Sequence, residues 1–142
     1  MPTYDATIEM YFWHEGRSAN KARFQAMVVR ALVEITQSIR SRLPVESWPL
    51  IATAAAYWQG STTRAEYDAA GWKCVELEQA MPEHHSKWRI VSATLGPYPY
   101  AEMSDFNFVV ELFLDFLQEV YGTADVPQDV YDQIDFWSRQ AA

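Results

Sequence analysis

Adjacent histidines at His84 and His85 are the residues in this sequence that most directly suggest a metal site. Neighbouring residues of a helix point about 100° apart, so the two imidazoles do not meet one ion without a third ligand. No HExxH or comparable spacing supplies that ligand. We therefore interpret the pair as the solvated start of a helix, and we expect neither a metal nor another cofactor.

Candidate nucleophiles are equally sparse. Cys74 is the only cysteine, and it stands among apolar residues in a segment with a helical pattern, where cysteine usually behaves as a small buried hydrophobe. His14 and Glu15 resemble a base with its orienting carboxylate, but adjacent residues rarely face each other. The chain contains no GxxxxGK[ST], GxGxxG or GxSxG motif. We therefore predict a non-catalytic protein, with a small helical enzyme built around the two adjacent histidines as an alternative.

Carboxylates are concentrated near the C-terminal end. Residues 1–101 hold ten acidic and ten basic residues, whereas residues 102–142 hold nine acidic residues and one base, Arg139. The last 41 residues therefore carry the whole net charge of −8. This asymmetry predicts a directed electrostatic surface, and it argues against direct binding of nucleic acid or of an anionic membrane.

Two predicted helices, over about 105–121 and 127–140, must position these carboxylates. In each helix the apolar residues recur at intervals of three and four, and the acids occupy the opposite arc. One phenylalanine of each helix falls among the acids, away from the core side. The predicted partner-binding surface consists of Phe108, Glu111, Asp115 and Glu119 on the first helix and Asp129, Asp132, Asp135 and Phe136 on the second.

Exposed aromatic side chains within an acidic field would give this surface anchors and electrostatic steering toward a protein with a basic surface. Two other interpretations of the same residues stay open. The acids could be ordinary solvated helix faces whose aromatic neighbours are covered by other segments. They could also pair with the arginines of a helix predicted over 19–43, which is basic on balance.

The rest of the chain also predicts helices, separated by glycine and proline. We expect them at about 19–43, 48–59, from a T-x-x-E capping box at Thr63 and Glu66 to about Met81, and at 85–95. The first 15 residues fit a helix or a strand, and we favour a helix. The expected fold is therefore all-α, with one domain over 1–142 built as a compact bundle of six or seven helices.

The number of cysteines and the residues at the N-terminus indicate the cellular compartment that we expect. A single cysteine excludes an internal disulfide, and the opening residues lack the basic and apolar regions of a signal peptide. No uninterrupted apolar run is long enough to span a bilayer. We therefore expect a cytoplasmic protein with no membrane partner.

The segment AAAYWQGSTT over 54–63, followed by Glu66 and Ala69-Ala70, resembles the alanine-rich helix, W-x-G turn and capped second helix of several helical bacterial immunity proteins. The resemblance covers about 25 of the 142 residues. It implies a cytoplasmic, antitoxin-like inhibitor that binds a cognate toxin tightly, often through acidic residues at or near the toxin's active site. No site motif of those families is present, so the site residues come from the helical wheel alone.

The expected function is a non-catalytic immunity protein that neutralises a bacterial toxin or nuclease through its acidic surface. A phage-encoded inhibitor of a host nuclease system, such as an anti-CRISPR protein or a DNA mimic, has the same profile of size, acidity and missing catalytic motifs. Besides the enzyme alternative, the sequence leaves open a homo-oligomeric scaffold, in the simplest case a homodimer, that uses the 15% of aromatic residues as its interface.

Overall fold

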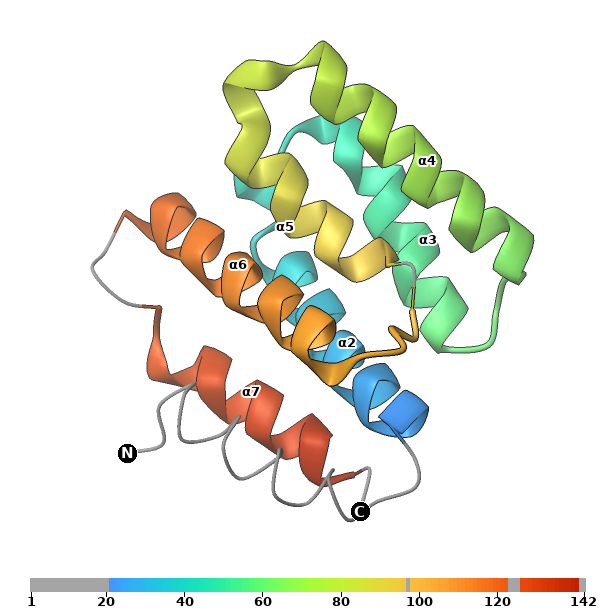
Figure 1. Ribbon diagram of the computed structural model, residues 1–142. Coiled ribbons are helices and arrows are strands. Elements are labelled where there is room, and N and C mark those ends of the chain that lie inside the picture. The colour runs from blue at the N-terminus through green and yellow to red at the C-terminus, as the bar shows by residue number, and fades with distance from the viewer. Residues whose placement is uncertain (1–20, 97, 123–125, 141–142) are drawn as a thin grey trace.

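The computed structural model describes residues 21–96, 98–122 and 126–140, which form α-helices and short 3-10 helices and contain no strand (Figure 1). The α-helices are α2 (Lys21–Ser38), α3 (Trp48–Trp58), α4 (Arg64–Ala80), α5 (His85–Leu95), α6 (Met103–Tyr121) and α7 (Gln128–Arg139). The 3-10 helices are η1 (Arg40–Arg42), η2 (Val45–Ser47) and η3 (Pro82–His84). The predicted all-α fold is confirmed. The expectations for the first 15 residues, including His14 and Glu15, lie outside the described residues.

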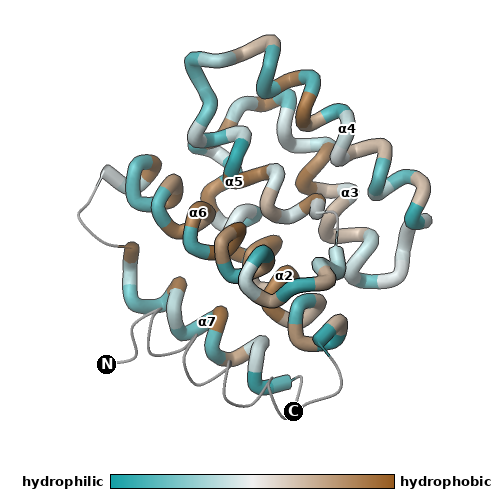
Figure 2. The backbone as a smooth tube through the Cα atoms, viewed as in Figure 1, coloured by the Kyte–Doolittle hydropathy of each residue, from teal (hydrophilic) through white to brown (hydrophobic). Residues whose placement is uncertain are grey.

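Helices α2 and α5 form the centre of this arrangement. α5 packs against α2, α3, α4 and α6, and α2 also packs against α3 and α7. Among the largest fully buried side chains are Tyr67 of α4, Trp88 of α5 and Phe106 and Phe113 of α6. The acidic helices α6 and α7 thus lie outside the two central helices, and hydrophobic and hydrophilic residues alternate along both of them (Figure 2).

Local capping signals locate several helix ends correctly. The side chain of Thr63 accepts a hydrogen bond from the backbone N–H of Glu66 at 3.2 Å, as a capping box requires. The Glu66 carboxylate accepts from the Thr62 hydroxyl instead of the cap backbone. Gly60 and Gly122 follow α3 and α6 with φ of 79° and 69°, a left-handed conformation that glycine adopts without steric cost.

Two predicted boundaries are wrong by a few residues. The helix expected over 19–43 ends as an α-helix at Ser38, and the 3-10 helix η1 follows it. At the end of α2 the hydroxyl of Ser38 donates to the carbonyl of Ile35 at 2.6 Å. Side-chain bonds of this kind compete with the backbone bonds of a helix. The helix predicted from about 105 begins two residues earlier, at Met103, so Ser104 lies inside its first turn. Glu102 has the extended backbone of a cap residue, and it makes no side-chain capping bond.

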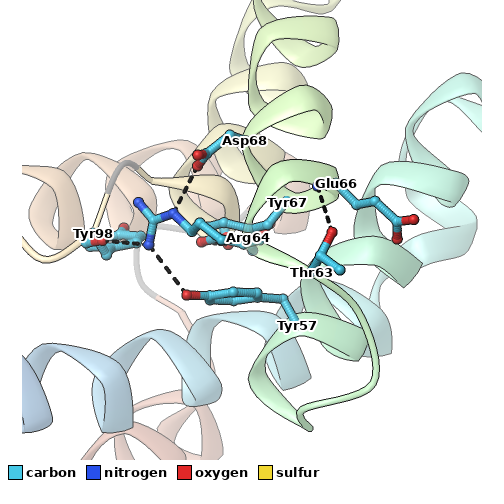
Figure 3. A network of polar contacts seen from close by, with 8 residues as sticks. Tyr57, Thr63, Arg64, Glu66, Tyr67, Asp68 and Tyr98 are labelled. Atoms are coloured by element: carbon cyan, nitrogen blue, oxygen red, sulfur yellow. Dashed lines mark hydrogen bonds and ion pairs between the residues drawn. The ribbon is translucent and has the colours of Figure 1, made fainter.

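The loop between α5 and α6 is held by side chains from two other helices. The fully buried Gln25 of α2 donates to the carbonyl of Tyr100 at 2.8 Å and accepts from its N–H at 2.7 Å. Arg64 of α4 donates to the carbonyl of Tyr98 at 3.0 Å (Figure 3). The Tyr98 hydroxyl donates to the carbonyl of Ala93 at 2.5 Å. These contacts hold the backbone of the loop that leads into α6.

Candidate protein-binding surface

The exposed side of α6 carries all four of the residues predicted on this helix. Phe108 is 60% exposed, which places it among the most exposed large hydrophobic residues of the described chain. Glu111, Asp115 and Glu119 are exposed as well, and they follow one another at intervals of four. The opposite side of the helix is buried through Met103, Phe106, Asn107, Val110, Phe113, Leu114 and Leu117.

The buried side of α6 is rotated relative to the apolar arc that the sequence predicts. Val109, Leu112, Phe116 and Val120, which recur at intervals of three and four on the predicted apolar arc, are only partly buried, whereas Phe106 and Val110 are fully buried. Phe108, Leu112 and Phe116 consequently form an apolar row at i, i+4 and i+8, beside the acidic row. We call these two rows together the α6 face.

The acids of the α6 face differ in their local contacts. Within the described residues, neither Glu111 nor Asp115 takes part in an ion pair or a side-chain hydrogen bond. Glu119 accepts a hydrogen bond from the hydroxyl of Ser86 at the start of α5. Glu111 and Asp115 are therefore the carboxylates of this face with most to gain from an external cation.

The residues predicted on α7 are more involved in contacts within their own helix. Phe136 is 57% exposed, and Asp129 and Asp132 are exposed. The carboxylate of Asp135 is only 25% exposed and lies 2.9 Å from Nε of Arg139. Gln128 donates to Asp132 at 3.2 Å. Because α7 packs mainly against α2 and α6 mainly against α5, the predicted surface divides into two groups on separate helices.

The contacts made by the arginines of α2 and η1 show whether these residues pair with the acids of α6 and α7. No ion pair between described residues joins an arginine of 21–42 to a carboxylate of α6 or α7. Arg23 donates to the backbone carbonyl of Gln140 at 3.1 Å. The other guanidinium groups lie over aromatic rings: Arg30 over Trp137 at 4.4 Å, Arg40 over Trp48 at 4.7 Å and Arg42 over Tyr121 at 5.3 Å. Between described residues, the arginines of this helix therefore contact α7 and the residue after it through a backbone hydrogen bond and an arginine–tryptophan contact, not through ion pairs with its carboxylates.

The adjacent histidines lie beside a hollow of about 260 Å³ between the start of α5 and the end of α6. Its lining residues are Glu83, His84, His85, Ser86, Lys87, Glu119 and Val120. His85 uses Nδ1 in a contact of 3.2 Å with the carboxylate of Glu78. In the described part of the chain, no hydrogen bond joins either histidine to Ser86. The hollow thus has the concave shape that the enzyme alternative needs. Its only hydroxyl, that of Ser86, bonds to the carboxylate of Glu119 and not to a histidine, so the site lacks the histidine–nucleophile pair that this alternative requires.

Cys74 is deeply buried, and the acidic residues of the described ranges form no cluster of metal ligands. Cys74 is 1% exposed, and burial raises the pKa of its thiol from 9.0 to about 12 because the thiolate is poorly solvated there. Across residues 21–96, 98–122 and 126–140, no group of three or more His, Cys, Asp or Glu side chains is arranged to hold a metal ion.

Sequence reasoning missed the most exposed large hydrophobic residue of the described chain, Trp72 of α4, which is 72% exposed. Val75 of the same helix is 40% exposed. The signal was available, because the buried residues Tyr67, Ala70 and Cys74 recur at intervals of three and four. A residue two positions after Ala70 lies about 200° around the helix, so it must point away from that buried row.

Comparisons with known proteins add no relative. No protein-family model matches the chain, and no curated protein or solved structure shows significant similarity to it. None of the helices within the described ranges has both the length and the apolar character needed to cross a membrane.

Proposed function

We propose that this protein acts by binding another protein, one with a basic surface, through the α6 face. The observation that carries this proposal is the position of Phe108, which is 60% exposed beside Glu111 and Asp115. An exposed aromatic side chain provides an anchor that gains energy when a partner covers it. Carboxylates around it steer a basic partner to the surface and fix its orientation.

The specific role that we propose is that of an immunity protein, which neutralises a bacterial toxin in the cytoplasm. Enzymes that cut nucleic acid attract phosphates with lysine and arginine, so their substrate surfaces are basic. An acidic protein surface can occupy such a basic surface and block it. An inhibitor of a host nuclease system would use the same chemistry, and the identity of the captured partner separates these two roles.

Capture experiments with matched charge reversals test the binding proposal. The wild-type chain, the Asp115→Lys variant and the Glu46→Lys variant are immobilised and exposed to a lysate of the native host. Glu46 is an exposed acid on η2, so both substitutions change the net charge equally and only one alters the α6 face. We expect a basic protein to bind the wild type and Glu46→Lys but not Asp115→Lys. Equal retention by all three would refute the α6 face as the binding site.

Neutralisation is tested with the captured protein. We expect its expression alone to arrest growth of a bacterial host, and co-expression of the wild-type chain to restore growth. The Glu111→Lys/Asp115→Lys double variant should restore growth much less, at equal soluble expression. A captured protein that is harmless by itself would contradict the immunity role while leaving the binding proposal intact.

A further inference from the structure

Helix α4 leaves an unusually large part of its surface exposed. Of its 17 residues, only Tyr67, Ala70 and Cys74 are buried. Its main neighbours are α3 and α5, and it lies at the edge of the molecule away from α7 (Figure 1). A helix of a globular protein usually exposes polar residues. α4 exposes Trp72 and Val75 among its polar residues, and a large exposed indole of this kind is typical of an interface.

A hollow of about 360 Å³ adjoins these two side chains. Trp72 and Val75 border it from α4, and Leu95 and Gly96 border it from the end of α5. Arg64 and Asp68 also line it, and their ion pair of 2.9 Å is part of the network that contacts Tyr57 and the carbonyl of Tyr98 (Figure 3). The same face therefore presents a projecting indole and, next to it, a recess.

Four charged residues of this face form two ion pairs within the helix, and the exposed acid Glu66 of the first turn adds one charge without an ion pair among the described residues. Arg64 pairs with Asp68 at 2.9 Å, and Lys73 pairs with Glu76 at 3.6 Å. The acids of the α6 face have no such balance. In a chain with a net charge of −8, two copies repel each other least if they meet through a face where both signs are present. The presence of both signs on α4 therefore favours a second copy of this chain as the occupant over a strongly charged partner.

We propose that two copies of the chain associate through α4, with the two helices antiparallel and a two-fold axis near Ala70 and Gly71. In this register Trp72 of each copy lies opposite Ala69 of the other, and Lys73 lies opposite Asp68. Ala65 and Ala69 are exposed and small, so the facing helix leaves room for the indole. A symmetric interface needs such self-complementarity, in which one patch supplies both the projection and the space for it.

This association leaves the proposed binding surface accessible. α4 packs against α3 and α5, whereas the α6 face lies on the outer side of a helix that packs against α5. The dimer would therefore present two copies of the α6 face. Because its test needs no other protein, failure of the dimer and failure of the proposed function are separate results.

Sedimentation equilibrium of the full chain over a concentration series tests the dimer. We expect a monomer–dimer equilibrium for the wild type, and a dissociation constant at least about tenfold higher for Trp72→Ala, since a buried interface tryptophan is a frequent hot spot. The matched control is Phe108→Ala, which removes an exposed aromatic residue from α6 and should leave the equilibrium unchanged. A wild type that stays monomeric throughout, or an unchanged constant in Trp72→Ala, would overturn the proposal.

A charge exchange tests the antiparallel register. Asp68→Lys and Lys73→Asp each place like charges opposite one another, so each single variant should weaken the dimer. The Asp68→Lys/Lys73→Asp double variant restores opposite charges and should recover most of the lost affinity. Circular dichroism confirms that each variant is folded, because exposed pairs of this kind contribute little to stability. A double variant no better than the single ones would contradict this pairing.

Discussion

Tyr67 is a buried tyrosine that connects three helices through its ring and its hydroxyl group. Tyr67 of α4 is fully buried, stacks on Tyr57 with ring centroids 4.1 Å apart, and donates its hydroxyl to the carbonyl of Thr94 at 2.8 Å. Burial raises the pKa of Tyr67 well above its ordinary value of 10.0, since the phenolate would lose its solvation there. The free energy of unfolding should therefore depend on pH through the Tyr67 hydroxyl, which bonds α4 to α5.

The Tyr67→Phe variant should reveal that link. Below about pH 10 the hydroxyl is protonated in both the folded and unfolded states, so the wild type keeps the full benefit of the hydrogen bond, about 1 kcal/mol. Above that pH the unfolded chain releases the proton first, and wild-type stability falls as the pH rises toward the raised folded pKa. Denaturant unfolding at pH 8 and about pH 10.5 should therefore show the difference between the two proteins shrinking by about 1 kcal/mol. A difference independent of pH would contradict the raised pKa.

Cys74 gives a second prediction at this scale. Its thiol is 1% exposed, and burial raises its pKa to about 12, so almost no accessible thiolate is present at neutral pH. We expect a thiol reagent such as DTNB to leave the native protein unmodified and to modify one thiol per chain in denaturant. Modification of the native protein at the rate of the unfolded chain would show that Cys74 is reactive after all.

The sequence predicts whether a side chain is exposed only where its position on its own helix determines the exposure. Phe108 follows from its place among acids on a helical wheel, and Trp72 could have been found in the same way. The half-buried positions of Leu112 and Phe116 could not, because they depend on the rotation of α6. That rotation depends on how α6 packs against α5 in the whole fold, and the loop before it is held by Gln25 and Arg64, which are far away in sequence.

At the scale of elements, the loop before α6 depends on one buried amide. Gln25→Leu keeps a similar size but leaves the N–H and the carbonyl of Tyr100 without the bonds of 2.7 and 2.8 Å that Gln25 provides. An unsatisfied buried group costs about 1–3 kcal/mol, and the two groups of Tyr100 are part-buried, so the free energy of unfolding should fall by about 1–2 kcal/mol. Gln37→Leu, at an exposed position of the same helix, is the control and should change it by less than about 0.5 kcal/mol. Equal effects of the two substitutions would show that the loop does not need Gln25.

Helix boundaries were predictable where a local signal sets them. Thr63 caps α4 through a bond to a residue three positions away, and Gly122 ends α6 with its positive φ. Ser104 has the same chemical character as Thr63, yet it lies within α6, and the extended backbone of the cap position falls on Glu102. The resemblance of 54–63 to the hairpin of immunity proteins describes the same local pattern, and it stays a prediction as far as function is concerned.

At the scale of the whole molecule, two exposed surfaces with different charge lie on different helices. The α6 face joins an apolar row to carboxylates, two of which have no partner within the described residues. The exposed face of α4 combines Trp72 with ion pairs that balance each other. We therefore assign the first surface to a basic partner and the second to a further copy of the chain.

The proposed role of the acidic α6 face predicts that partner binding depends on salt concentration. Steering by the α6 face is electrostatic, so raising the ionic strength should slow association with the partner while changing dissociation less. Stopped-flow or surface-based kinetics at two salt concentrations measure both rates. In Asp115→Lys the association rate should already be low and should depend less on salt. An association rate insensitive to salt in the wild type would contradict steering by these carboxylates.

The central claim is that the α6 face, and not α7, binds the partner. Titration calorimetry of the captured partner with Phe108→Ala and with Phe136→Ala tests this claim. The two residues are a matched pair, because both are exposed phenylalanines beside acidic residues. Phe108 on α6 is 60% exposed and Phe136 on α7 is 57% exposed. Neither substitution should change the free energy of unfolding by more than about 0.5 kcal/mol. We predict that Phe108→Ala weakens binding by at least about tenfold and that Phe136→Ala leaves it within about twofold of the wild type. Loss of affinity in Phe136→Ala with wild-type affinity in Phe108→Ala would contradict the claim.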